Sequence, residues 1–134
     1  MAQDLGLAPL VVPEDKRAAY HAGAVLAAGS LVSLLGAAID AFGVAGISPK
    51  EAQAALVPLA RSALRGLEQR GPVAGLTGPV VRGDVDVVRR HLESLPPELR
   101  EIYKGLAYRA FVLTQGAMTT NVRAAFLDLL EPRR

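Results

Sequence analysis

An uncharged run, Ala18–Ile39, constrains the fold of this chain more than any other stretch of its sequence. No Asp, Glu, Lys or Arg falls within the run. Glu14 and Asp15 precede it, where the positive end of a helix dipole favours acidic side chains. Large apolar residues recur along it at the spacing of one helix face, namely Leu31, Leu35, Ile39 and Phe42. We therefore predict one long helix over residues 14–44.

Two environments suit such a helix. The run exceeds the roughly 20 residues that cross a bilayer, and small residues recur at every fourth position, as in membrane helix pairs. These small residues are Ala19, Gly23 and Ala27, then Gly29, Ser33 and Ala37. Ala and Gly dominate the run, however, and the rest of the chain is amphipathic. We expect a buried central helix of a water-soluble protein rather than a transmembrane helix.

Composition excludes several classes of function. The 134 residues suit one domain, and 15 basic against 13 acidic residues leave a net charge of only +2, which argues against a nucleic-acid partner. The absence of cysteine excludes disulfides, thiolate metal sites and a cysteine nucleophile. No cluster of ligands suggests a metal site. The polar, acidic start does not resemble a secretory signal, so we expect a cytoplasmic protein without a membrane anchor.

A second helix begins at Ser48-Pro49-Lys50-Glu51. This tetrapeptide combines a capping serine, a proline at the first helical position and the glutamate of a capping box. We expect Pro58 to kink this helix and Gly71 to end it. Its apolar residues follow helical periodicity, and they are Ala52, Ala55, Leu56, Leu59, Ala60, Ala63, Leu64 and Leu67.

Three more helices are predicted from periodicity, over residues 84–95, 98–116 and 120–130. Their expected inner faces are Val85, Val88, Leu92 and Leu95; then Leu99, Ile102, Leu106, Ala110 and Leu113; then Val122, Ala125, Phe126 and Leu129. No pair of strands is visible. The prediction is an all-α fold, a bundle of five to six helices around the long, small-residue-rich first helix.

The first residues contain two short segments of different character. AQDLGL has the composition of a helix end, and APLVVP is a short β-branched run bounded by prolines, which predicts a strand. A lone strand needs another edge to pair with, and the sequence offers none.

The loop LTGPVVRGD joins two predicted helices. We expect Asp84 to cap the following helix by accepting a hydrogen bond from the amide of Asp86 or Val87. Gly83 would permit the sharp entry, and Gly78-Pro79 would form an extended turn before it. The Arg-Gly-Asp triplet is a chance match to an integrin ligand, and the loop lacks the ending of a Walker motif.

Capping does not require Thr77 or Arg82. An arginine beside a helix N-terminus, with loop amides nearby, suits a phosphate or carboxylate group. The alternative is a surface arginine and a turn threonine. His21 is either a buried, hydrogen-bonded histidine or a catalytic group, whereas His91 is expected to face solvent. Arg100 is expected on a solvated, ion-paired face.

Four segments, in order, carry a resemblance to a known family. They are AYHAGAVLAAGSLVSLLGAA, ALVPLARSALRGL, GPVAGLTGPVVRGDVDVVRRHL and ELREIYKGLAYRAFVL. From about Leu10 to its end, the chain resembles the helical C-terminal domain of Rossmann-like oxidoreductases, many of them described only as a domain of unknown function. That domain is similar in fold to the C-terminal domain of 6-phosphogluconate dehydrogenase and more loosely to ketopantoate reductase. Its most specific parts are Tyr20-His21-Ala22 with the following helix, and Leu76-Thr77-Gly78-Pro79 with Arg82-Gly83-Asp84.

The resemblance implies that cofactor binding and substrate binding belong to different domains. Residues 1–13 would be the remnant of a preceding nucleotide-binding domain or a linker, and residues 14–134 would form the helical substrate and dimerisation domain. NADP would bind the N-terminal domain. Since this chain has no G-x-G-x-x-G between a strand and a helix, we expect it to hold no cofactor and to be inactive alone.

The resemblance also places Tyr20, His21, Thr77 and Arg82 on the substrate cleft of a homodimer. Arg82 would hold the anionic group of a small substrate, and His21 would hydrogen-bond a hydroxyl or carbonyl at the reacting carbon. Family members often carry a polar residue near Gly29, so the glycine here weakens a proton-transfer role for this helix. The alternative functions are a non-catalytic helical self-association module and, less favoured, a small membrane protein.

Overall fold

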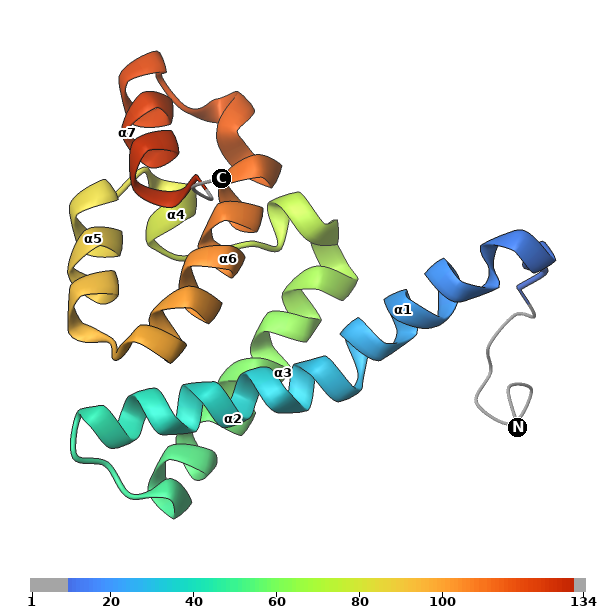
Figure 1. Ribbon diagram of the computed structural model, residues 1–134, viewed down its shortest axis with the longest axis horizontal. Helices are drawn as coiled ribbons and strands as arrows, with labels where there is room; N and C mark the ends of the chain where they lie inside the picture. Colours follow the sequence, from blue (N-terminus) through green and yellow to red (C-terminus); the bar gives the residue numbers. More distant parts are fainter. Residues whose placement is uncertain (1–9, 132–134) are drawn as a thin grey trace. The chain divides into compact units, whose positions relative to one another are not determined.

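The computed structural model describes residues 10–131, which form helices and connecting turns (Figure 1). The elements are η2 (Glu14–Lys16), α1 (Arg17–Ala27), α2 (Gly29–Val44), α3 (Pro49–Ala74), α4 (Pro79–Arg82), α5 (Val85–Ser94), α6 (Pro97–Thr114), η3 (Gln115–Ala117) and α7 (Thr120–Leu130). No strand occurs among residues 10–131, so the all-α prediction is confirmed. The chain divides into two compact units, Met1–Gly36 and Ala37–Arg134.

The segment before the first helix departs from prediction. Leu10–Pro13 form neither helix nor strand, so the strand predicted for APLVVP is wrong over its described part. The reason is that a strand without a second edge leaves its backbone groups unpaired. The rest of that run and the AQDLGL segment lie outside the described residues.

The helix predicted over residues 14–44 is interrupted at Ala28. This residue has φ −115° and ψ −82°, yet its N–H still donates to the carbonyl of Ala24 at 3.1 Å. The N–H of Val32 in turn donates to the Ala28 carbonyl at 3.2 Å, so helical bonding continues across the break. No side chain of α1 or α2 is fully buried, so the expected buried central helix is wrong for α1, whereas the predicted apolar face of α2 is partly buried at Leu31, Leu35, Ile39 and Phe42. A lack of charge allows burial but does not itself supply a covering surface.

The core of the second unit lies among α4, α5, α6 and α7. Its buried side chains interlock around Phe111 and Phe126, whose ring centroids lie 5.7 Å apart at 45°. Aromatic rings supply a large apolar area and favour such tilted pairs. The other buried members are Val80, Val88, Leu92, Ala107 and Leu130. The inner faces predicted for α5 and α7 are confirmed at Val88, Leu92 and Phe126.

The inner face predicted for α6 is wrong at Ile102 and Leu106, although Ala110 of that face packs against the core. The buried residues are Ala107, Phe111 and Thr114, whereas Ile102 and Leu106 from the predicted face are 41% and 48% exposed. Successive helical residues are about 100° apart, so the two sets lie on neighbouring sides of one helix. The apolar surface of α6 is wider than its neighbours cover, and packing of Phe111 against Phe126 decides which side turns inward.

The start of α3 follows the sequence closely, and its end follows Gly71. The Ser48 side chain accepts from the Glu51 N–H, and the Glu51 carboxylate accepts from the Ser48 N–H, so the capping box is confirmed. Pro58 lies inside α3, and the non-helical φ/ψ values of this helix fall at Gly71, with φ 77° and ψ 177°. After Gly71 the chain returns so close that a Cβ on Gly75 would lie 2.8 Å from the Gly66 carbonyl oxygen. Only glycine fits there.

Along α3, burial covers part of the predicted apolar face. Ala52 and Leu56 are buried, whereas Leu59, Leu64 and Leu67 are exposed. The second half of this helix therefore adds apolar surface to the exterior of its unit.

Candidate functional site

The loop singled out in the sequence contains a short helix, α4. Gly78 has φ 104°, a conformation that L side chains rarely adopt, and it turns the chain into Pro79 at the first helical position. Gly83 then ends the helix with φ 75° in the left-handed region. The extended turn predicted for Gly78-Pro79 is therefore present at Gly78, with ψ −175°, whereas the short helix that begins at Pro79 was not predicted. Val80 is buried in the core, and this anchor explains why the loop coils.

Arg82 is paired with Asp84 across the end of α4. The Arg82 Nε donates to the Asp84 Oδ2 at 2.9 Å, with the two side chains 62% and 40% exposed. Asp84 occupies the N-cap position of α5, but its carboxylate makes no capping hydrogen bond, contrary to prediction. A guanidinium is a charged donor, and the bond it makes to a carboxylate is stronger than one from a neutral amide.

The ion pair with Asp84 reduces the number of Arg82 hydrogen-bond donors that can reach an anionic ligand. Nε is engaged, while a guanidinium has further N–H donors on its two terminal nitrogens. An anionic ligand would meet these donors and the Asp84 carboxylate together, and the carboxylate would repel it. Thr77 is exposed and precedes α4, whereas Arg82 is its last residue, so the short helix separates the two.

Tyr20 and His21 lie on α1, in the other unit of the chain. Both are exposed, Tyr20 by 53%, so the reading of His21 as a buried histidine is wrong. Consecutive residues of a helix point about 100° apart, and one small ligand would therefore contact them from different sides. Tyr20 and His21 thus belong to one unit, and Thr77 and Arg82 belong to the other.

A histidine–tyrosine pair joins α5 to α6 and was not predicted. His91 Nδ1 and the Tyr103 hydroxyl are 2.8 Å apart, and the rings meet edge to face with centroids 5.6 Å apart. Burial raises the pKa of the Tyr103 hydroxyl. His91 is exposed, as expected, but it is bonded rather than free. The partners lie on different helices, so no local spacing in the sequence indicates the pair.

Arg100 has a structural role that sequence reasoning missed. Its Nε donates to the Leu92 carbonyl at 2.7 Å, and its Nη2 donates to the Leu95 carbonyl at 2.9 Å. These carbonyls belong to the end of α5, where backbone acceptors lack helical partners. The predicted solvated, ion-paired face is thus wrong for Arg100. An arginine shortly after a helix end and a Pro-Pro turn is the signal that indicates such a cap.

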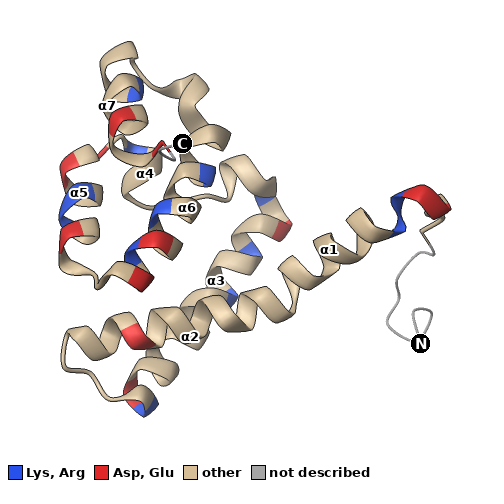
Figure 2. Cartoon of the chain, viewed as in Figure 1, with Lys and Arg blue, Asp and Glu red and all other residues tan. Residues whose placement is uncertain are grey.

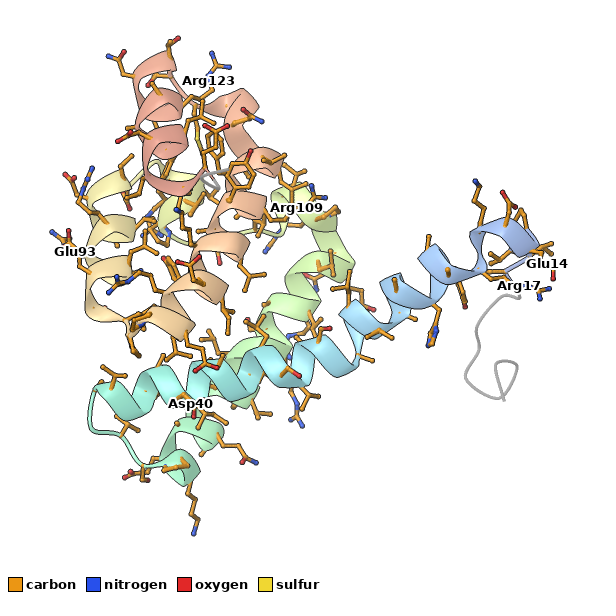
Figure 3. The ribbon with its side chains drawn as sticks, viewed as in Figure 1. Glu14, Arg17, Asp40, Glu93, Arg109 and Arg123 are labelled. Atoms are coloured by element: carbon orange, nitrogen blue, oxygen red, sulfur yellow. The ribbon has the colours of Figure 1, made fainter. Side chains whose placement is uncertain are left out.

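Charge is absent from the middle of the α1–α2 segment. Figure 2 shows its ribbon in one neutral colour between charged ends, and Figure 3 labels Glu14 and Arg17 at one end and Asp40 toward the other. The helical stretch Glu14–Val44 is long and apolar enough to cross a membrane, and its most apolar window contains no buried residue. Within the described residues, no group of three His, Asp or Glu side chains forms a candidate metal site.

Comparison with known proteins places the chain in a family. No curated protein and no solved structure matches it. The family model described as a domain of unknown function, DUF2520, matches residues 1–110, which is well over half of the chain. This match covers the uncharged segment, the α4 loop and most of α6. The chain therefore belongs to the DUF2520 family.

Proposed function

We propose that this chain is the helical substrate-binding and dimerisation domain of an NADP-dependent oxidoreductase, with the cofactor held outside these 134 residues. Membership of the DUF2520 family and the all-α fold support the proposal. The oxidoreductase context comes from the resemblance of the Tyr20-His21 and Thr77–Asp84 segments. The chain would then provide one wall of a substrate site and the contact between subunits.

The observation that carries the dimerisation role is the exposed α1 helix, which is uncharged after Arg17, together with the exposed side of α2. These helices have no charged residue between Ala18 and Ile39, and no fully buried side chain. A water-soluble protein rarely leaves so large an apolar surface in water, because burial of apolar area is the main favourable term in association. A second copy of the chain is the covering surface that is present at equal concentration. A twofold homodimer is the simplest such assembly.

The substrate role rests on Arg82 and the residues around it. In the proposed enzyme, the terminal nitrogens of Arg82 hold an anionic group of a small substrate. NADP, if held by a nucleotide-binding domain outside these residues, would supply the hydride. Because Arg82 is paired with Asp84, an anionic substrate must either displace the Asp84 carboxylate or bind beside it against its repulsion.

A charge placed in the uncharged segment tests the dimerisation role. Ala27→Glu introduces a carboxylate on α1, and Ala124→Glu is the matched control on α7, where alanine is also exposed. We expect Ala27→Glu to weaken the dimer about 100-fold or more, because a buried unpaired charge costs several kcal/mol. Analytical ultracentrifugation over a concentration series measures both variants. A wild-type chain that stays monomeric at high concentration overturns the dimerisation role.

A membrane protein is the second candidate, favoured by one observation. The Glu14–Val44 stretch meets the length and apolarity of a membrane span. It ranks below self-association for two reasons. Ala and Gly contribute little insertion energy to a membrane helix. The helices α5 and α6 also pack around an apolar core, as the helices of water-soluble proteins do. Purification without detergent supports the first proposal, whereas partition of the expressed chain into membranes supports the second.

A further inference from the structure

Asp84 occupies a position that serves two interactions, of which one is formed. It is the N-cap residue of α5, where a side-chain oxygen usually accepts a hydrogen bond from one of the first amides of the helix. Its carboxylate instead accepts from the Nε of Arg82 at 2.9 Å and makes no capping bond. The residue therefore stands at the start of a helix while its side chain binds the end of the preceding one.

The start of α5 lacks the side-chain acceptor that it would otherwise have. The N–H of Val85 donates to the Gly83 carbonyl at 2.9 Å, and the N–H of Val88 donates to the Asp84 carbonyl at 3.2 Å. The two amides between them, those of Asp86 and Val87, make no hydrogen bond to any described residue. These are the amides from which an N-cap carboxylate accepts, so both partners of a capping bond are present and the bond is not made.

The backbone around Asp84 is held, so a change of partner needs little movement of the chain. Gly83, with φ 75°, ends α4, and a Cβ on it would lie 3.3 Å from Val122 of α7, so the turn is packed against that helix. The Asp84 N–H donates to the Pro79 carbonyl at 2.8 Å. The ψ of Asp84 is 69°, whereas N-cap residues usually adopt β-region values. Capping therefore requires rotation of the side chain and a modest increase in that one torsion.

The two interactions are similar in strength. An ion pair between exposed side chains is weakened by water and salt, and both side chains here are more than a third exposed. A capping hydrogen bond stabilises a helix by a comparable amount. We propose that Asp84 changes partner between Arg82 and the N-cap of α5, and that an anion bound to Arg82 drives it to the cap. The partner change stands on the local geometry, and its control by an anion rests on the proposed function of Arg82.

This arrangement makes Asp84 an autoinhibitory contact that is coupled to α5. Without ligand, the Asp84 carboxylate competes with an anion for the Arg82 guanidinium. Once displaced, it accepts from the amides at the helix start, where the helix dipole also favours a negative charge. Ligand binding would thereby stabilise the first turn of α5, whose Val88 and Leu92 are buried in the core.

Amide hydrogen–deuterium rates at Asp86 and Val87, measured by NMR on the isotopically labelled full chain, report the cap directly. Arg82→Ala removes the ion pair and leaves the Asp84 carboxylate free to cap. Asp84→Asn also removes the ion pair and keeps a capping side chain, whereas Asp84→Ala, the matched control, removes both interactions. We expect the rate at one or both amides to fall about fivefold in Arg82→Ala and Asp84→Asn, and not to fall in Asp84→Ala. Amides of α6 report the global stability of each variant.

Unchanged rates in Arg82→Ala and Asp84→Asn, or the same slowing in Asp84→Ala, would overturn the partner change. Inorganic phosphate added to the wild type tests its control by an anion, and we expect it to slow the same amides about fivefold and to have no such effect in Arg82→Ala. A phosphate-induced shift of the Arg82 Nε–H resonance without slowing at Asp86 or Val87 would overturn the coupling and leave the anion-binding role of Arg82 intact. Slowing in Arg82→Ala with no phosphate effect on the wild type would keep the partner change and overturn that role.

Discussion

The two sides of α6 make opposite predictions for alanine substitution. Phe111 is 1% exposed, and its ring packs against Phe126 and, at a centroid distance of 6.2 Å, against Tyr108. Truncating a buried phenylalanine to alanine removes its transfer energy and leaves a cavity, at a cost of about 3–5 kcal/mol. We expect Phe111→Ala to lower the free energy of unfolding by about 4 kcal/mol, at every protein concentration.

Leu106 lies on the predicted but uncovered side of the same helix. It is 48% exposed, and full burial of a leucine is worth about 1.5–3 kcal/mol, so its truncation costs about 1 kcal/mol in the monomer.

Urea denaturation followed by circular dichroism and tyrosine fluorescence measures both variants. Since a 4 kcal/mol loss approaches the total stability of many domains, Phe111→Leu serves as a milder variant, with an expected loss of about 1 kcal/mol. Equal losses for Phe111→Ala and Leu106→Ala in dilute solution would refute the assigned packing.

Two further predictions concern the ion pair and the capping box. Arg82→Ala should abolish calorimetric binding of a small acidic ligand, whereas Asp84→Asn should strengthen it up to about fivefold by removing the competing carboxylate; equal affinity of Arg82→Ala and wild type would eliminate the anion site. Hydrogen bonds from the Ser48 side chain and backbone lower the pKa of Glu51 below its usual 4.5. A lowered folded pKa adds stability that is present above the unfolded pKa and lost as pH falls through the folded value, so Glu51→Gln should flatten the acid-side loss in urea midpoints. Parallel midpoint curves for variant and wild type would contradict that linkage.

Features that depend on residues close together in the sequence could be predicted from the sequence. The capping box at Ser48 and Glu51 depends on residues three apart, and Gly71 and Gly83 adopt the left-handed conformations that turns require. Helical periodicity likewise indicated the all-α class and the inner side of α5, because Val88 and Leu92 sit at helix spacing with charged neighbours on the other side.

Interactions between residues of different helices could not be predicted from the sequence. The Arg100 cap on α5 and the His91–Tyr103 bond each join two helices whose approach depends on the whole core. The short α4 helix formed inside a glycine- and proline-containing loop because burial of Val80 stabilises it. For the candidate site, residue type indicated that Arg82 suits an anion, but its pairing with Asp84 became visible only in three dimensions.

The sequence by itself determined the all-α class, the capping box at Ser48 and Glu51, and the absence of charged residues between Ala18 and Ile39. The tertiary structure decided which side of each helix is buried. The helix α6 has more apolar surface than its neighbours cover, and the side that carries Phe111 is the one that packs into the core. Periodicity reports that a side is apolar, but packing volume and ring geometry select the side that is buried. For the same reason the uncharged α1–α2 segment was readable from its residues, while its exposure was a property of the folded chain.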